Sequence, residues 1–295
     1  MEKLNTPIEN AVALTALPAK GQDIFINTHP LWSFAGGRGV YGGSTVAQCL
    51  VAAQNTISTD YVVHSIQSCF LKPANPKLSI EYHVERTRDG NAFANRTIHA
   101  RQAGGVICTA IVNFVRVRSG EGKGLRHARE MPVGLALPDK APMDGKGEPG
   151  PFETRRGEVL NKRCDDDVSA TKIRYWMRAK GTIRKEAGIQ AHLAALAYMS
   201  DGYLLGAIMQ VHDDPNRPFG IQTTFGASLS HTVYVHNVEA VRADQWLCSE
   251  RQSPWAANER GLAIQRIWSI DGTLIATVIQ EGILRIKEPA GKVKL

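Results

Sequence analysis

The sequence lacks the clustered ligands that metal and redox sites require. Its nine histidines form no HxxxH or HxH pair, and its five cysteines form no CxxC. Such spacings bring several ligands onto one ion or place two thiols together. We therefore expect no metal and no redox centre. The cysteines are interpreted as free thiols in a reducing compartment; they are Cys49, Cys69, Cys108, Cys164 and Cys248.

Long apolar runs and dense basic blocks are also missing. No stretch of about 18 apolar residues occurs, so we expect no membrane-spanning helix. Residues 1–20 lack the basic start and apolar core of a secretory signal. The net charge of +7 and the pI of about 9.2 favour anionic partners. Because the basic residues are scattered and not interleaved with aromatics, nucleic acid is not an expected partner.

The last three residues carry a weak targeting pattern. Val293-Lys294-Leu295 approximates the peroxisomal address Ser-Lys-Leu, with valine in place of the small residue. A frayed basic tail explains the same residues, and the sequence leaves both interpretations open. The expected localisation is peroxisomal or cytoplasmic.

The sequence does contain a long internal repeat. Residues 64–118 and 231–285 align without a gap after a shift of 231 − 64 = 167 residues. His64 then falls on His231, and Asn113 falls on Gln280. A repeat of this length indicates a duplicated domain, since solenoid units are about 20–50 residues long. Where one copy keeps polar groups that its twin has lost, those groups indicate the active half.

Each half predicts one helix followed by an antiparallel meander, which is an α+β fold. Helices are expected over residues 44–57, after a glycine-rich loop, and over residues 189–209. Residues 119–170, rich in proline, glycine and charge, are interpreted as a linker that crosses between the halves. This divides the chain into residues 1–118, 119–170 and 171–295. We expect the two halves to pair edge to edge, which removes exposed strand edges.

Two polar side chains fall on faces that should be buried. At helical spacing Asp201 shares a face with Leu204, although an ionised carboxylate costs several kcal/mol to bury without partners. The helix over residues 44–57 has no Asp or Glu. At strand spacing Gln280 shares a face with Val278, and an unpaired amide there costs about 1–3 kcal/mol. A structural hydrogen bond remains an alternative to catalysis for both residues.

Two further motifs suggest familiar chemistry but do not fit it. Ser228 precedes the first strand of the second repeat in a broken G-x-S-x-G, and a nucleophile elbow requires a following helix. Gly37 to Gly42 matches G-x-G-x-x-G, but no apolar strand precedes it, so we expect no dinucleotide and no other cofactor. These glycines still bring backbone close to a helix N-terminus, which can bind an anion or polarise a carbonyl.

Together these stretches resemble the type II acyl-CoA thioesterases, a family with a double hot-dog fold. The resemblance covers about residues 20–117 and 150–286. It implies that the Asp, the Thr or Ser, and the Gln of the family's catalytic trio fall on Asp201, Ser228 and Gln280. The motifs that carry it are Tyr41-Gly42-Gly43, His64 to Pro73, Val84 to Phe93 with Arg96, Pro151-Phe152-Glu153, Tyr198 to Asp201, Ser228 to His231 and Val278 to Gly282.

The resemblance implies hydrolysis of an acyl-CoA to free acid and CoA. Asp201 would deprotonate a water that Ser228 and Gln280 position, without a covalent intermediate. The chain departs from the family at Ser44, where Gln often follows the glycine pair, and at Ser230, where Asp is common. These departures leave open an acyl-transfer or acyl-release enzyme acting on a specialised thioester in a biosynthetic pathway. A non-catalytic acyl-CoA-binding protein and a homo-oligomer also remain open.

Overall fold

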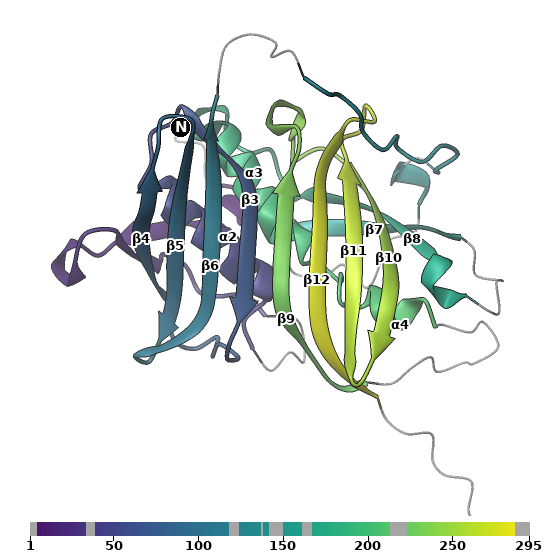
Figure 1. The fold of residues 1–295 in the computed structure, drawn as a ribbon, viewed down its shortest axis with the longest axis horizontal. Coiled ribbons are helices and arrows are strands. Elements are labelled where there is room, and N and C mark those ends of the chain that lie inside the picture. The colour runs from purple at the N-terminus through teal and green to yellow at the C-terminus, as the bar shows by residue number, and fades with distance from the viewer. Residues whose placement is uncertain are drawn as a thin grey trace, which may run out of the picture.

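The chain folds around one large antiparallel sheet, seen in a computed structural model (Figure 1). The structure describes residues 5–33, 39–117, 124–136, 138–141, 150–160, 167–212 and 223–286. The sheet has 12 strands in the order β1-β2-β4-β5-β6-β3-β9-β12-β11-β10-β8-β7. The helices lie behind the sheet in this view. None of the helices within these ranges is long and apolar enough to cross a membrane.

The N-terminal half forms the β1-to-β3 side of the sheet. Along α2, Val46 and Leu50 are fully buried in the core. The elements are α1 (Pro7–Val12), β1 (Leu14–Ala16), a 3-10 turn (Pro18–Lys20), β2 (Ile24–Asn27), α2 (Gly42–Gln54), β3 (Tyr61–Phe70), β4 (Glu81–Asp89), β5 (Phe93–Gln102) and β6 (Gly105–Arg116).

The C-terminal half forms the β9-to-β7 side. Its elements are β7 (Phe152–Leu160), β8 (Lys172–Ala179), α3 (Gly188–Ser200), α4 (Ala207–Gln210), β9 (Thr223–Val235), β10 (Leu247–Ala257), β11 (Arg260–Trp268) and β12 (Leu274–Ile286). Short 3-10 turns occur at Pro138–Lys140, Val168–Ala170, Lys185–Ala187 and Val238–Ala240.

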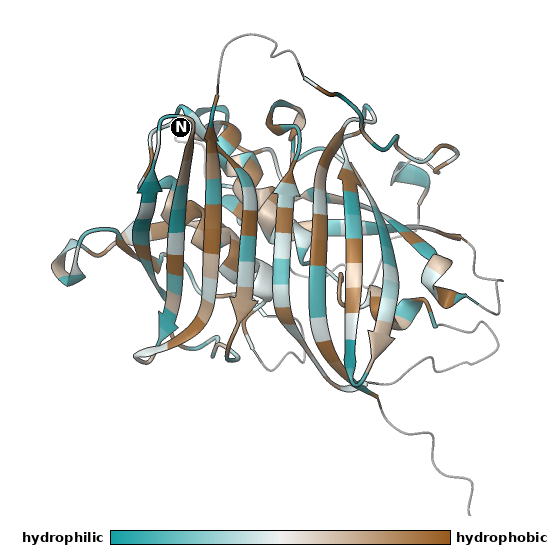
Figure 2. Cartoon of the chain, viewed as in Figure 1, coloured by the Kyte–Doolittle hydropathy of each residue, from teal (hydrophilic) through white to brown (hydrophobic). Residues whose placement is uncertain are grey.

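The two halves join through β3 and β9, which pair antiparallel from Ser65 opposite Tyr234 to Cys69 opposite Ser230. This confirms the expected edge-to-edge pairing. Helices α2 and α3 also pack against each other, and buried residues of both halves form one continuous core. Figure 2 shows hydrophilic and hydrophobic residues interleaved along the strands, as a sheet with one covered face requires.

Some elements differ from those expected from the sequence. The helix predicted over residues 189–209 ends at Ser200, because Tyr203 adopts a left-handed backbone (φ 57°) before α4 begins. Within residues 119–170, where little more than a linker was expected, β7 pairs with β8 and extends the C-terminal side of the sheet. Strands β1 and β2 were not anticipated, since such short runs show little periodicity.

The ungapped alignment of the repeats is wrong in β12. A shift of 263 − 167 = 96 matches Ala263 of β11 to Arg96 of β5, and both are on the helix-covered face. Ala263 pairs with Gln280, whereas Arg96 pairs with Val112. The structural counterpart of Gln280 is therefore Val112 and not Asn113.

The error arises at the hairpin turn. Trp268 pairs with Leu274, a separation of 274 − 268 = 6 residues, whereas Arg101 pairs with Val106, a separation of 106 − 101 = 5 residues. One extra residue moves every following side chain to the opposite face of the sheet relative to an ungapped alignment.

The histidines are also not equivalent. Gln280 pairs with His231, and its counterpart Val112 pairs with Ile66, so His231 corresponds to Ile66 and not to His64. By the same pairing, Ser228 corresponds to Val63, because each lies beyond an irregularity in its strand.

Candidate active site

Asp201 stands where the chain leaves α3, at the C-cap of that helix. Its side chain is buried, and both oxygens are hydrogen-bonded. Oδ1 accepts from Nε2 of Gln280 at 2.6 Å, and Oδ2 accepts from the backbone N–H of Gly43 at 2.8 Å. The two donors come from different repeats. Because a carboxylate oxygen can accept more than one hydrogen bond, each oxygen can still accept from a bound water.

Gln280 links Asp201 to Ser228. Its Nε2 donates to Oγ of Ser228 at 2.6 Å as well as to the carboxylate. The Gln280 side chain is fully buried. The structure thus brings together the three polar residues that the sequence analysis singled out, at hydrogen-bonding distance.

Ser228 reaches this position through a bulge in β9. Ser230 pairs with Glu281, whereas Ser228 pairs with the next residue of β12, Gly282, so Leu229 is the extra residue. A bulge of this kind re-aims the side chains beyond it. The expectation that Ser228 precedes the strand is wrong, because the serine lies inside β9.

The glycines before α2 allow backbone to approach the carboxylate. A Cβ on Gly43 would lie 2.2 Å from the carbonyl oxygen of Tyr198, and a Cβ on Gly42 would lie 2.9 Å from Oδ2 of Asp201. Tyr41 donates its hydroxyl to the same Tyr198 carbonyl at 2.8 Å, and burial raises the pKa of Tyr41 well above its usual value. The start of the N-terminal helix is thereby fixed against the end of the C-terminal helix.

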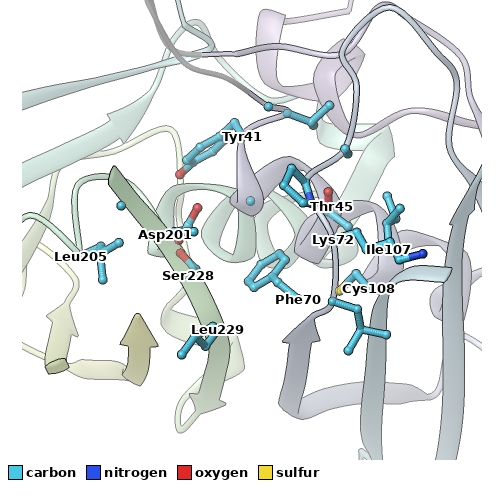
Figure 3. Close-up of a pocket in the computed structure, with 18 of the residues that line it drawn as sticks. Tyr41, Thr45, Phe70, Lys72, Ile107, Cys108, Asp201, Leu205, Ser228 and Leu229 are labelled. Atoms are coloured by element: carbon cyan, nitrogen blue, oxygen red, sulfur yellow. The ribbon is translucent and has the colours of Figure 1, made fainter. Parts of the chain in front are cut away.

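Asp201 and Ser228 line a cavity of about 480 Å³ between the repeats. In Figure 3 these two side chains lie close to each other on one side of the cavity, with Lys72 on the other side. Apolar side chains supply much of the rest of the wall: Phe70, Ile107, Leu205, Phe225 and Ile283. Gln280 is not among the lining residues, so it contacts a ligand only through its two partners. Within the described ranges, no three His, Cys, Asp or Glu side chains gather as metal ligands would.

His231 is the neighbour that the sequence analysis missed as part of the site. It is fully buried, pairs with Gln280 across β9 and β12, and places Nε2 2.8 Å from Oγ of Ser200. Burial lowers the pKa of His231, although the charge of Asp201 and the side chain of Gln280 act in the opposite direction. The imidazole is therefore neutral at neutral pH. The ungapped repeat concealed its position by matching it to His64.

The two departures from the family pattern lie beside the site. Ser44 is buried in the first turn of α2, next to the cavity-lining Thr45. Ser230 pairs with Cys69 at the junction between β9 and β3. Neither serine lines the cavity, so both affect the framework around it.

Comparison with known proteins extends this picture to the whole chain. Residues 29–115 match the family model of the acyl-CoA thioesterase N-terminal domain, and residues 134–284 match that of the acyl-CoA thioesterase C-terminal domain. The chain belongs to the acyl-CoA thioesterase family. Membership confirms the predicted type II thioesterase resemblance and the enzyme class, a hydrolase of acyl-CoA thioesters.

Relatives of known name cover most of the chain. Acyl-coenzyme A thioesterase 8 of Rattus norvegicus is 31% identical over 87% of this chain and 83% of its own length. Acyl-CoA thioesterase 2 of Haemophilus influenzae is 30% identical over 86% of this chain and 90% of its own length. The crystal structure of acyl-CoA thioesterase II TesB2 from Mycobacterium marinum superimposes with a TM-score of 0.74 at 29% identity, covering 96% of this chain and 99% of that one.

The fold class is confirmed as well. A protein from Alicyclobacillus acidocaldarius described as having a hot dog fold matches with a TM-score of 0.72 at 19% identity, covering 97% of this chain and all of that one. At this identity the likeness concerns the fold alone. Each repeat here is one long helix against an antiparallel meander, and the acyl-CoA thioesterase repeats form the expected double hot-dog.

Proposed function

We propose that Asp201, Ser228 and Gln280 form the catalytic centre of this thioesterase and that the nucleophile is water. The observation that carries the proposal is the bridge made by Gln280, whose one amide nitrogen holds both the carboxylate and the hydroxyl at 2.6 Å. This bridge orients two oxygen atoms toward one point at the cavity wall. A water there has an acceptor in Asp201 and a hydroxyl partner in Ser228.

In this mechanism Asp201 acts as the general base. It takes a proton from the water as the water oxygen attacks the thioester carbonyl carbon, giving a tetrahedral oxyanion. Collapse of that species breaks the C–S bond, and the proton held by Asp201 passes to the departing CoA sulfur. Ser228 accepts a hydrogen bond from Gln280, so its own hydroxyl proton remains available to the water or to the substrate.

The oxyanion requires a donor, and the start of α2 supplies one. The first N–H groups of a helix have no acceptor within the helix. That of Gly43 is already donated to Asp201, so the N–H of the preceding residue, Gly42, is the group we assign to the carbonyl oxygen. Its position at the positive end of the helix dipole favours developing negative charge.

The cavity wall assigns directions to the two parts of the substrate. Leu205, Phe225 and Ile283 line one side beside Ser228 and suit an acyl chain. Lys72 is the one cation among the described lining residues and suits the phosphates of CoA. We place the acyl chain on the apolar side and the CoA moiety toward Lys72.

Asp201→Asn tests the proposal. The amide is isosteric but cannot accept the water proton, so we expect kcat to fall by about 10³-fold while the fold is retained. Release of free CoA thiol from acyl-CoAs of short, medium, long and branched chains measures turnover. Asp244→Asn is the matched control, because Oδ2 of Asp244 also accepts a backbone N–H, from Ile183 at 3.0 Å, away from the cavity.

Near-normal thiol release by Asp201→Asn, with Asp244→Asn unchanged, would overturn the assignment of the base. Tight acyl-CoA binding by the native chain without thiol release would instead support a non-catalytic binding protein. Transfer of the acyl group to an added acceptor in preference to water would support an acyl-transfer enzyme.

Localisation and assembly remain proposals. A relative named peroxisomal acyl-coenzyme A thioester hydrolase 1, from Saccharomyces cerevisiae, is 25% identical over 84% of this chain and 86% of its own length. We propose a peroxisomal location by analogy with that protein, to be checked by co-localisation of a fluorescent fusion with a peroxisomal marker. The division at residues 118 and 170 and a homo-oligomeric state are also proposals, which limited proteolysis and light scattering would test.

A further inference from the structure

His231 and Gln280 each present a buried polar atom that has no hydrogen-bond partner in the described part of the chain. These atoms are Nδ1 of His231 and Oε1 of Gln280. The two residues pair directly across β9 and β12, and both are fully buried. Side chains opposite each other on one face of an antiparallel pair have Cβ atoms about 4.5–5.5 Å apart. An unpaired buried polar atom costs about 1–3 kcal/mol, so two facing each other are expected to satisfy one another.

The direction of that contact follows from counting protons. The amide nitrogen of Gln280 donates to Asp201 and Ser228, which uses both of its N–H groups. The remaining amide atom, Oε1, can only accept. His231 must therefore carry a proton on Nδ1 in order to donate to it. Since the imidazole is neutral, its Nε2 is then unprotonated and accepts the hydroxyl proton of Ser200, whose Oγ lies 2.8 Å away.

We infer that His231 is a positioning residue for the proposed catalytic centre: its Nδ1–H donates to Oε1 of Gln280 and fixes which way the amide faces. The inference rests on the proposed roles of Asp201, Ser228 and Gln280. Hydrogen bonds then run in one direction, from Ser200 through His231 to Gln280, and end on the carboxylate and on the serine oxygen. A rotated amide would turn its oxygen toward the carboxylate of Asp201, which repels it, and would leave Ser228 without its donor.

His231 acts through Gln280 and does not contact the substrate. It is fully buried and is not among the residues that line the cavity. Loss of its Nδ1 donor should therefore lower kcat and leave KM nearly unchanged. In the N-terminal repeat the corresponding position is Ile66, which has no donor to offer.

The tautomer of His231 in the native enzyme is the first test. Nitrogen-15 NMR of histidine-labelled protein distinguishes a protonated from an unprotonated ring nitrogen, and the signal missing from His231→Asn identifies the residue. We expect a protonated Nδ1 and an unprotonated Nε2 at neutral pH. A protonated Nε2 with an unprotonated Nδ1, or a doubly protonated ring, would overturn the inference. This readout does not depend on activity.

Two half-mimics of histidine provide the second test. In His231→Asn the amide falls near the place of Nδ1, so it can still donate to Gln280, and we expect kcat to be largely retained. In His231→Gln the amide falls near the place of Nε2, so it keeps the contact with Ser200 and loses the one with Gln280. We expect kcat of this variant to fall by about 10²-fold at an unchanged KM, because small misplacements of catalytic groups have effects of that size.

Ser200→Ala is the control for the other side of the ring. It removes the partner of Nε2 and leaves the donor at Nδ1, so we expect little loss of kcat. Equal losses in His231→Asn and His231→Gln would indicate a general packing role and would contradict the inference. If Asp201→Asn is inactive while His231→Gln is fully active, the inference alone fails. If Asp201→Asn stays active, the proposed function fails whichever tautomer His231 adopts.

Discussion

The two repeats share one meander but fill its centre differently. Where the C-terminal repeat has Ser228, His231 and Gln280, the corresponding positions of the N-terminal repeat are Val63, Ile66 and Val112, all almost fully buried. Conversely, Arg96 of the N-terminal repeat corresponds to Ala263 of the C-terminal one. Polar groups in the core of a hot-dog repeat are thus not required by the fold, since one copy forms with aliphatic residues at the same three positions.

The buried arginine shows what the N-terminal repeat does with its own polar capacity. Arg96 is almost fully buried and makes five hydrogen bonds, which uses every N–H of its guanidinium. Its acceptors include the hydroxyl and carbonyl of Thr56, just after α2, and the carboxylate of Asp89 on β4. This network ties the helix end to the sheet and leaves no donor free for a ligand.

The N-terminal repeat nevertheless contributes to the site. It supplies Gly42 and Gly43 beside the carboxylate, and Phe70 and Lys72 in the cavity wall. The comparison therefore suggests a division of labour, in which one repeat holds the substrate and the other holds the proposed reacting water. The following substitutions exchange or remove the differences.

Gln280→Leu makes the C-terminal repeat resemble its twin and should have the largest effect. The volume is nearly conserved, but Asp201 and Ser228 lose their shared donor, so we expect kcat to fall by about 10²-fold or more. Thiol-release kinetics with acyl-CoA measure this, and circular dichroism checks the fold. Turnover close to that of the native enzyme would mean that the amide bridge is only structural.

Val112→Gln places the amide in the N-terminal repeat instead. All five donors of the facing Arg96 are already used, so the new oxygen finds no donor there. We expect a loss of about 1–3 kcal/mol in the free energy of unfolding and no gain in activity. Denaturant unfolding measures the first and thiol release the second. Unchanged stability would show that the N-terminal core can accommodate an amide as readily as the C-terminal one.

Lys72→Ala tests the binding role assigned to the N-terminal repeat and should have the smallest effect. Lys72 is exposed, so one contact with a phosphate contributes about 1 kcal/mol or less, and KM for acyl-CoA should rise by about threefold to fivefold. An acyl-N-acetylcysteamine thioester has no phosphates, so its KM should not change. Lys77→Ala, an exposed lysine outside the cavity, is the control. An equal rise for both thioesters would contradict the placement of CoA.

The sequence predicted the kind of fold and the three polar residues, but not how the repeats correspond. Asp201 and Gln280 were accessible because each interrupts an apolar periodicity, a local signal that survives errors in element boundaries. Ser228 became a candidate only through the family resemblance, since its position depends on a bulge at Leu229 that periodicity does not reveal. His231 was misjudged because one extra residue in a turn and one bulge shift the alignment of the repeats.

The helix boundary shows the same limit. The periodic pattern continues past Asp201 to residue 209, yet the helix ends at Ser200 because the following turn and a left-handed Tyr203 redirect the chain. This interruption turns the carboxylate toward the N-terminal repeat and Gly43. Contacts between residues 158 positions apart in the chain cannot be read from a local pattern.

The most direct test of the account is a single turnover in water labelled with oxygen-18, with enzyme in excess over acyl-CoA. If Asp201 activates water that attacks the thioester directly, the released acid contains one labelled oxygen, and the enzyme shows no change in intact mass at any time during the turnover. Label in the carboxylate of Asp201, or a mass increase equal to the acyl group, would show a covalent acyl-enzyme and would contradict the account.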